Sequence, residues 1–326
     1  MKITGVLGAL ALLLLAGSAS AQEKTLAIVV KGLDNPFFDL IRQGCEKAQA
    51  ELKGGYRCYY TGPASTSDEA GEVQIIDDLL TKGVAALAIS PSNAPAVANV
   101  LRQRKPTIPV MTIDADLLAQ DKALRKTYLG TDNYLMGVKL AEHLKKLKPN
   151  GGSLCLVLGN VAADNINQRA AGTRDTLSGK KGTERLTGQG GWKEVSGCPL
   201  FTNDDAAKGN QMMADVLIAN KTLDAFVLEG GWPQFAPQAY AQLTDQYMDR
   251  IKSKQLALVV ADTLPPQIEA LKQGRSDAQV GQRPLEMGYR APFIMKDMVE
   301  GKRVDPIYFT GLDECTPDNV ATCLKR

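Results

Sequence analysis

A strand–loop–helix pattern near the start of this chain restricts its fold more than any other feature. The apolar run Leu26–Val30 has the composition of a buried strand. Beyond a polar loop, apolar residues recur at helical spacings of three and four: Phe38, Ile41, Cys45 and Ala48. Between the two, Asn35 can cap the helix, and Pro36 fits its first turn, where no backbone N–H is needed. The pattern predicts the opening βα unit of a parallel sheet.

The same alternation of strand and helix continues along the chain. A first half has further strand patterns at 56–60, 84–89 and 109–113. The pattern restarts near 127–130, and strands are expected at 154–158, near 200, and at 225–228, 257–261 and 278–281. A chain of 326 residues is long enough for two domains. We therefore predict an α/β fold of two Rossmann-like domains, each with a parallel sheet.

Residues 1–21 have the features of a secretory signal peptide. Lys2 supplies the positive start, Val6–Ala16 is an apolar run, and Ala19-Ser20-Ala21 is a cleavage site before Gln22. The apolar run is short for a membrane span, although an uncleaved anchor is the alternative interpretation. We therefore predict export, with the mature chain in the periplasm. The formal net charge of +2 gives no electrostatic argument for nucleic acid or a membrane surface as a partner.

Six cysteines in an exported chain indicate disulfides, and six cysteines allow 15 pairings. The predicted topology places them in three local pairs, so we predict nearest-neighbour bridges: Cys45 with Cys58, Cys155 with Cys198, and Cys315 with Cys323. Here Cys155 and Cys198 are expected on consecutive strands. Buried free thiols are the alternative. A zinc site is disfavoured, because the chain has one histidine and no C-x-x-C motif, and no metal or cofactor is expected.

Polar side chains follow the ends of several predicted strands. Because the carboxyl ends of parallel strands line the ligand-binding edge of an open α/β sheet, these side chains are expected to meet in a cleft between the domains. Carboxylates, amides and one arginine suit sugar hydroxyls, and aromatic rings pack on the C–H faces of a sugar. Capping or core packing is the alternative role for each residue. The candidate ligand-binding residues are Asn35, Phe37, Phe38, Asp114, Arg169, Glu229, Trp232, Asp262 and Gln282.

The run Asn35-Pro36-Phe37-Phe38 after a first strand resembles the type I periplasmic binding proteins of bacterial sugar importers, of the ribose-binding kind. The resemblance extends from about residue 25 to about residue 310. It implies that Asn35, Phe37 and Phe38 form the sugar-stacking motif. Further positions match the family's acidic residue of the first domain, its sugar-binding arginine, its second-domain aspartate and its amide near the second crossing: Asp114, Arg169, Asp262 and Gln282.

The resemblance also implies a hinge of three chain crossings, near 127–130, 281–284 and 306–309. The first domain would then contain residues 22–128 and 283–307, and the second would contain residues 129–282 and 308–326. The chain departs from the ribose-binding pattern at three places. Ala115 and Asp116 follow Asp114 where the pattern has Arg, Glu229 replaces Asn, and Asp204 falls near an expected aromatic. These departures indicate a sugar other than ribose, a polyol or an amino-bearing ligand.

The expected function is that of a periplasmic solute-binding protein of an ABC importer. It would bind a sugar or polyol by hinge closure and deliver it, as a monomer, to an inner-membrane permease. One alternative is a periplasmic sugar sensor for a chemoreceptor or kinase. Another is an exported carbohydrate-active enzyme, for which Asp114 and Asp116 could be a carboxylate pair. The absence of a nucleophile–base motif makes a binding protein, and not an enzyme, the expected class.

Overall fold

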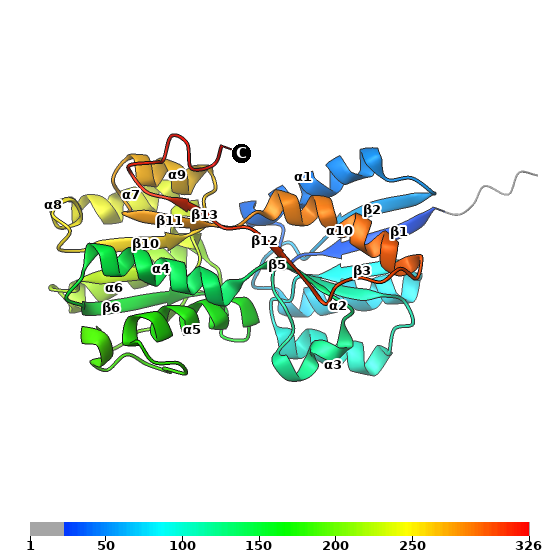
Figure 1. Ribbon diagram of the computed structural model, residues 1–326, viewed down its shortest axis with the longest axis horizontal. Helices are drawn as coiled ribbons and strands as arrows, with labels where there is room; N and C mark the ends of the chain where they lie inside the picture. Colours follow the sequence, from blue (N-terminus) through cyan, green and yellow to red (C-terminus); the bar gives the residue numbers. More distant parts are fainter. Residues whose placement is uncertain (1–22, 326) are drawn as a thin grey trace, which may run out of the picture.

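The computed structural model describes residues 23–325, which form two α/β lobes lying side by side (Figure 1). The predicted signal peptide, residues 1–21, lies outside the described residues. The described part of the chain has two sheets of mostly parallel strands, one in each lobe, as the sequence predicts. None of its helices is both long enough and apolar enough to cross a membrane.

The first domain is built on a six-stranded parallel sheet with the strand order β12-β5-β4-β3-β1-β2. The strands β1, β3 and β4 are buried along nearly all of their length, as expected for strands covered on both faces. The bounds are β1 Lys24–Val29, β2 Tyr56–Thr61, β3 Ala86–Ile89, β4 Val110–Ile113, β5 Tyr128–Thr131 and β12 Ile307–Thr310.

Helices cover both faces of this first sheet, so two apolar clusters form, one on each side. On one face α1 lies against α10, which enters from the far end of the sequence (Figure 1). The bounds are α1 Pro36–Glu51, α2 Glu69–Lys82, α3 Ala94–Arg104, the 3₁₀ helix η1 Ala119–Leu124 and α10 Pro284–Val299. As predicted, Asn35 caps α1, because its Oδ1 accepts a 2.9 Å hydrogen bond from the N–H of Phe37.

The second domain repeats this arrangement around the order β13-β11-β10-β9-β6-β7, with β8 also paired to β6 and β13 antiparallel. Its strands are β6 Gly152–Leu158, β7 Trp192–Glu194, β8 Leu200–Phe201, β9 Ala225–Leu228, β10 Ala257–Ala261, β11 Ala278–Gly281 and β13 Asp313–Cys315. Its helices are α4 Asn133–Leu147, α5 Asp164–Ser178, η2 Gln189–Gly191, α6 Ala206–Ala219, η3 Trp232–Phe235, α7 Pro237–Asp245, α8 Met248–Lys252 and α9 Pro265–Lys272.

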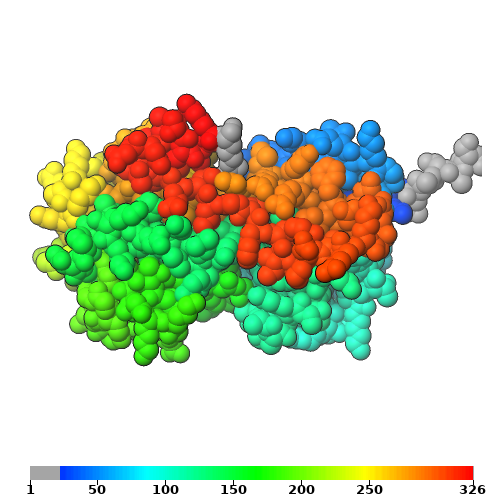
Figure 2. Space-filling model, viewed as in Figure 1, coloured from blue at the N-terminus to red at the C-terminus, as the bar shows by residue number. Residues whose placement is uncertain are grey.

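The chain passes between the domains three times: after β5, after β11 and after β12. Because β5 and β12 both pair in the first sheet, that sheet extends to Thr131 and Thr310, beyond the predicted boundaries at 128 and 307. Two side-chain contacts join neighbouring crossings. The Oγ1 of Thr131 donates to Gln282 Oε1 at 2.9 Å, and Arg283 Nη2 donates to Asp313 Oδ1 at 3.0 Å. Figure 2 shows the C-terminal part of the chain extending over both lobes on one face.

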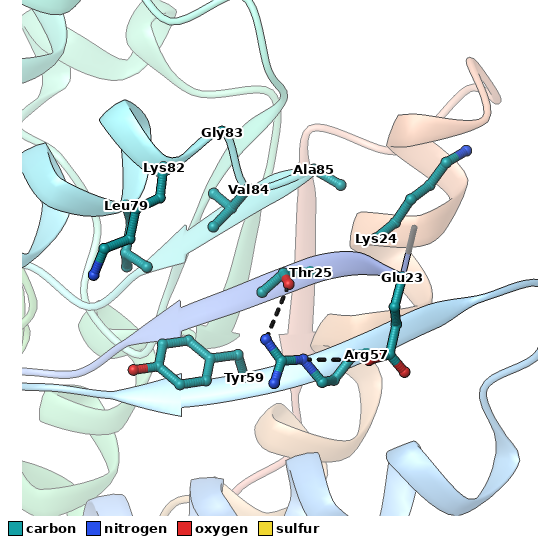
Figure 3. Close-up of a pocket in the computed structure, with 10 residues that line it drawn as sticks. All are labelled: Glu23, Lys24, Thr25, Arg57, Tyr59, Leu79, Lys82, Gly83, Val84 and Ala85. Atoms are coloured by element: carbon teal, nitrogen blue, oxygen red, sulfur yellow. Dashed lines mark hydrogen bonds and ion pairs between the residues drawn. The ribbon is translucent and has the colours of Figure 1, made fainter. Parts of the chain in front are cut away.

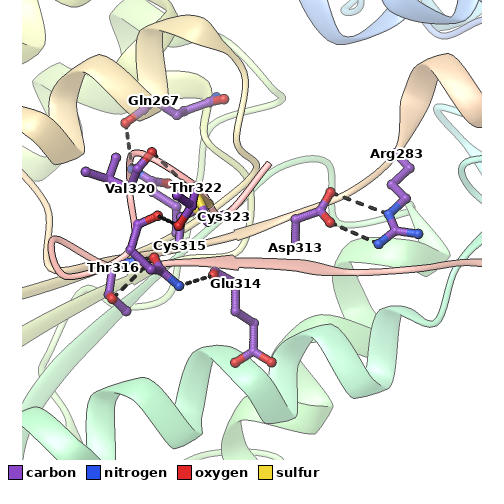
Figure 4. Close-up of a disulfide and its surroundings, with 11 residues drawn as sticks. Gln267, Arg283, Asp313, Glu314, Cys315, Thr316, Val320, Thr322 and Cys323 are labelled. Atoms are coloured by element: carbon purple, nitrogen blue, oxygen red, sulfur yellow. Dashed lines mark hydrogen bonds and ion pairs between the residues drawn. A yellow bond between two sulfur atoms is a disulfide. The ribbon is translucent and has the colours of Figure 1, made fainter. Parts of the chain in front are cut away.

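The three predicted disulfides are present: Cys45–Cys58, Cys155–Cys198 and Cys315–Cys323. The first joins α1 to β2. In the second, Cys155 lies on β6, as predicted. Cys198 was predicted to lie on the next strand, but it lies in the connection between β7 and β8. The chain turns at Ser196-Gly197, and the strand predicted there starts only at Leu200. The third closes a loop of the tail beside the Arg283–Asp313 pair (Figure 4).

Candidate functional site

A cavity lies between the domains, at the carboxyl ends of both sheets. Eight of the nine candidate residues line it: Asn35, Phe37, Phe38, Asp114, Arg169, Trp232, Asp262 and Gln282. The sequence reasoning did not select five further lining residues: Lys31, Asn165, Ile166, Asp204 and Phe235. The two domains therefore meet at the carboxyl ends of their strands, where the sequence predicted the cleft.

The aromatic side of the cavity comes from the start of α1. Phe37 and Phe38 follow the capping residue directly, and their rings meet edge to face, 5.3 Å apart between centroids. Both side chains are buried, and both also belong to the apolar cluster beneath the helix. Trp232, in η3 of the second domain, adds a third aromatic ring. Flat apolar rings beside polar groups suit the mixed surface of a sugar.

The polar side of the first domain is centred on Asp114, the residue after β4. Its backbone is left-handed, with φ of 63°. Its Oδ2 accepts a 2.7 Å hydrogen bond from Ser90 Oγ and lies 3.8 Å from Lys31 Nζ. The ammonium of Lys31, which is buried, also donates to Asn165 Oδ1 at 3.3 Å in the second domain. Lys31 thus partly neutralises Asp114 and bridges the two domains.

Arg169 supplies the buried cation of the second domain. It lies on α5 and is 1% exposed. Its Nε donates to Asn133 Oδ1 at 2.8 Å, and its Nη1 donates to the carbonyl oxygen of Glu229 at 2.7 Å. Its Nη2 has no hydrogen-bond partner among the described residues. Since two of its nitrogens are fixed and one is free in a cavity wall, Arg169 is held ready to donate to a bound molecule.

Asp262 faces Arg169 from the end of β10, also with a left-handed backbone, φ 76°. Gln282 Nε2 donates to its Oδ1 at 2.8 Å, and the N–H of Gly231 lies 3.4 Å from its Oδ2. Burial raises the pKa of Asp262, and the nearby Arg169 partly offsets this rise. Gln282 in turn accepts from Thr131, so the carboxylate is connected to the hinge.

Glu229 does not line the cavity, although the sequence placed it there. It directly follows β9 and is fully buried, and only its backbone carbonyl serves the site, by holding Arg169. Its carboxyl group lies toward Thr173, and burial raises its pKa to about 7. The cause is local. The chain after β9 continues through Gly230 and Gly231 into η3, so Trp232 reaches the cavity instead.

Some of the missed residues had signals in the sequence. Lys31 directly follows the first apolar strand, and Asn165 lies four residues, about one helical turn, before Arg169. Asp204 was noted only as a departure from the family pattern. Its place in the wall depends on a left-handed turn after β8, which has only two residues and is hard to recognise from sequence.

The structure holds the domains closed over the cavity. Three hydrogen bonds cross the cleft: the N–H of Ala94 donates to Ala162 O at 3.3 Å, Asn160 donates to Glu69, and Lys31 donates to Asn165. Each joins a loop or helix start of one domain to the facing edge of the other. These bonds hold the facing edges of the two domains together, and a wider opening of the cleft would break them.

A second hollow lies at the opposite edge of the first sheet, where β1 and β2 begin (Figure 3). Two of its charged groups are already paired with each other: Arg57 contacts Glu23 and also donates to Thr25 Oγ1 at 3.2 Å. It lies on one domain only, at the amino ends of the strands, whereas ligands of open α/β sheets bind at the carboxyl ends. The interdomain cavity is therefore the better candidate.

Comparison with known proteins agrees with this geometry. The family model described as "Periplasmic binding protein domain" matches residues 26–303, most of the chain. The chain belongs to this family. Within the described residues, no group of histidine, cysteine, aspartate and glutamate side chains could hold a metal ion.

Relatives of this periplasmic binding protein include the ribose import binding protein of Salmonella typhimurium. It is 22% identical over 314 residues, which cover 94% of this chain and 95% of the relative. A solved solute-binding protein from Burkholderia graminis, in complex with D-arabinose, is 27% identical, with a TM-score of 0.79 over 93% of this chain and 98% of that one. Another from Agrobacterium vitis, with bound D-fucose, has a TM-score of 0.81 at 20% identity, over 91% and 97%. The chain thus has the fold of the type I periplasmic binding proteins.

Proposed function

We propose that this protein is the solute-binding component of an ABC importer and captures a sugar or polyol in the periplasm. The observation that carries the proposal is the interdomain cavity itself. Aromatic rings, fixed carboxylates and a buried arginine with a free donor converge in it from both domains. The relatives' names support the same role, because they are import binding proteins and ABC solute-binding proteins. They do not favour a chemoreceptor sensor.

Binding would work through closure. Sugar hydroxyls both donate and accept, so they can accept from Arg169 and donate to Asp114 and Asp262, while Phe37 and Phe38 pack on the ring. Since these groups belong to different domains, the ligand contacts all of them only in the closed state and therefore shifts the equilibrium toward it. Such hinge closure is the known behaviour of periplasmic binding proteins. An inner-membrane permease would then recognise the closed monomer.

An enzyme is the less supported reading. Asp116, the second carboxylate of the pair considered in the sequence, does not line the cavity. It is held by Arg125, by Thr112 Oγ1 at 2.6 Å and by the N–H of Leu117 at 2.9 Å. These partners hold the pKa of Asp116 below its ordinary value despite burial. A carboxylate engaged in this way is a structural group, so we propose binding without turnover.

Thermal unfolding of the mature protein against pentoses, hexoses and polyols tests the proposal. A ligand at about 100 times its dissociation constant adds about 2.7 kcal/mol to the free energy of unfolding. We expect a selective rise of the melting temperature with one class of sugar or polyol, and unchanged ligand recovered afterwards. No shift with any carbohydrate would contradict the proposal, and a released product would indicate an enzyme.

A further inference from the structure

Asp204 enters the cavity wall on an unusual backbone. It follows the short strand β8, and both Asn203 and Asp204 are left-handed, with φ of 55° and 62°. Residues other than glycine seldom adopt this conformation, and where they do at a binding site the strain is often part of the function. Asp114 and Asp262, the other carboxylates of the cavity, are left-handed too. The turn after β8 therefore directs a third carboxylate toward the same space.

The carboxylate of Asp204 is half-buried, and one of its two oxygens is left without a partner. Its Oδ1 is shielded from solvent and has no hydrogen-bond partner among residues 23–325. Gly159 makes room for it, because a Cβ at that position would collide with Oδ1 and press on the ring of Trp232. An unpaired buried oxygen is costly, so a bound molecule that donates to it gains what the free protein lacks.

The free donor of the site is Nη2 of Arg169, which also has no partner in the described part of the chain. The cavity wall thus offers one open acceptor and one open donor. The charges are unequal, because Lys31 and Arg169 face three carboxylates: Asp114, Asp204 and Asp262. Burial raises the pKa of Asp204, and Lys31 is the largest opposing influence. An anionic group beside Asp204 would add a further unpaired negative charge.

We propose that Asp204 determines specificity: it selects sugars or polyols that present a hydrogen-bond donor to its Oδ1, and it rejects those with a deoxy or carboxylate group there. This inference rests on the proposed function. The donor is a hydroxyl or an ammonium group. Sites that bury an unpaired polar group discriminate strongly against ligands that cannot pair with it, whereas an apolar wall discriminates weakly.

A double-mutant cycle between protein and ligand tests this. First, calorimetry finds the tightest binder among D-ribose, D-arabinose, D-galactose and D-glucose. Its deoxy, amino and uronate analogues are then titrated into the wild type, Asp204→Ala and Asp204→Asn. Asp205→Asn is the matched control, since it makes the same charge change at an exposed neighbour, and asparagine caps α6 as well as aspartate does.

For the wild type, we expect at least one deoxy analogue to bind ten-fold or more weakly than its parent, and the uronate not to bind. In Asp204→Ala the affinity for the parent sugar falls ten-fold or more, whereas the deoxy analogue has the same affinity for the variant as for the wild type. Tighter binding of the amino analogue, lost in Asp204→Asn, identifies an ammonium donor; equal or weaker binding identifies a hydroxyl. The control variant, Asp205→Asn, should bind the parent sugar and each analogue with the same affinities as the wild type.

Two other results have distinct meanings. If sugars bind the wild type and Asp204→Ala with the same affinities and the same ranking of analogues, the role of Asp204 is refuted while the proposed function stands. If neither these sugars nor any sugar or polyol of the thermal unfolding screen binds the wild type, both proposals fail together. Circular dichroism of each variant checks that the fold is intact.

Discussion

At the scale of single residues, the buried charges of this protein fall into two kinds. Arg169 and Asp262 are fixed by neighbours and directed into the cavity. Glu229 lies behind them with neither carboxylate oxygen hydrogen-bonded in the described residues. A buried carboxyl group in that position is most stable when protonated, which explains the rise of its pKa to about 7. Its protonation should therefore affect stability more than it affects the ligand directly.

We predict that Glu229→Gln flattens the dependence of stability on pH. The pKa of Glu229 is about 7 in the fold against an ordinary 4.5, so the folded state binds more protons between these values. Wild-type stability should therefore fall as pH rises from about 4.5 to about 7, on the order of 3 kcal/mol for this residue, and then level off. Glutamine does not titrate. Urea unfolding at pH 5 and pH 8 measures the difference, and Glu269→Gln at an exposed site is the control. Parallel profiles for Glu229→Gln and wild type would contradict the prediction.

The residues at strand ends were predictable, because the carboxyl edge of a parallel sheet is encoded by apolar runs followed by polar residues. The direction in which each side chain points could not be predicted from the sequence. Glu229 shows this, since two glycines after β9 turn the chain so that Trp232 and not the carboxylate reaches the cavity. Asp204 is the opposite case, since it lines the cavity although the sequence did not predict it. Its position depends on left-handed φ at two consecutive residues, which has no reliable signal in the sequence. Lys31 was missed because a lysine is seldom buried unless it is paired.

At the scale of helices and strands, close helix crossings position the site. The helices α4 and α5 meet at Gly137 and Gly172, where added Cβ atoms would overlap the carbonyl oxygens of Arg169 and Tyr134. In the first domain α1 and α10 meet in the same way at Gly44 and Gly288. The alternation of strands and helices was predictable from periodicity. The return of α10 to the first domain was expected only from the family resemblance, because it depends on contacts distant in sequence.

We predict that Gly137→Ala weakens both the fold and ligand binding. Alanine favours helix by about 1 kcal/mol, but here its methyl group must push α5 away, at a cost of roughly 1–3 kcal/mol. Since α5 carries Arg169, sugar affinity should fall as well. Ile251→Val is the control, because it removes a buried methyl group, at a cost of about 0.5–1.5 kcal/mol, from the apolar cluster beneath α8, and α8 supplies no cavity residue. Calorimetry and urea unfolding should show lost stability in both variants but lost affinity only in Gly137→Ala. Equal affinities in the two variants would rule out this coupling.

The three disulfides should differ in what they contribute. Cys155 and Cys198 are 43 residues apart, whereas Cys315 and Cys323 are 8 apart. Because a bridge stabilises mainly by restricting the unfolded chain, the longer loop should contribute about 4 kcal/mol and the shorter about 2.5 kcal/mol. We therefore predict a larger loss of unfolding free energy for the Cys155→Ala, Cys198→Ala double variant than for the tail pair. Urea unfolding measures both, and a larger loss from the tail pair would contradict the entropic account.

At the scale of the whole molecule, the two domains are joined at two places with different roles. At the hinge, the Thr131–Gln282 contact joins the first and second crossings, and the Arg283–Asp313 contact joins the second and third (Figure 4 shows Arg283–Asp313). At the opening of the cleft, Glu69 accepts from Asn160 of the other domain and from Asn93 at 2.7 Å. The hinge contacts lie where the domains are connected in every state, whereas the Glu69–Asn160 contact exists only when they are closed. A change at this contact should therefore alter the equilibrium between the open and closed states without altering a residue of the cavity lining.

We predict that Glu69→Ala shifts the protein toward the open state and weakens sugar binding without removing a lining residue. One charge-assisted hydrogen bond contributes about 1.5 kcal/mol, and a ligand that binds only the closed form loses affinity in proportion to the closed population. We expect up to about a ten-fold rise in the dissociation constant. Small-angle X-ray scattering should show a larger ligand-free radius of gyration, which returns to the wild-type value at saturating ligand.

Glu142→Ala is the control for this variant, because Glu142 pairs with Lys139 at 3.0 Å within α4 and does not contact the other domain. It should change neither the radius nor the affinity. If Glu69→Ala lowers affinity while the radius stays at the wild-type value, its effect acts on the cavity and not on closure. If it changes neither quantity, the contact at the cleft opening contributes nothing to the closed state, and closure depends on the ligand and on the other two cleft contacts, Ala94–Ala162 and Lys31–Asn165.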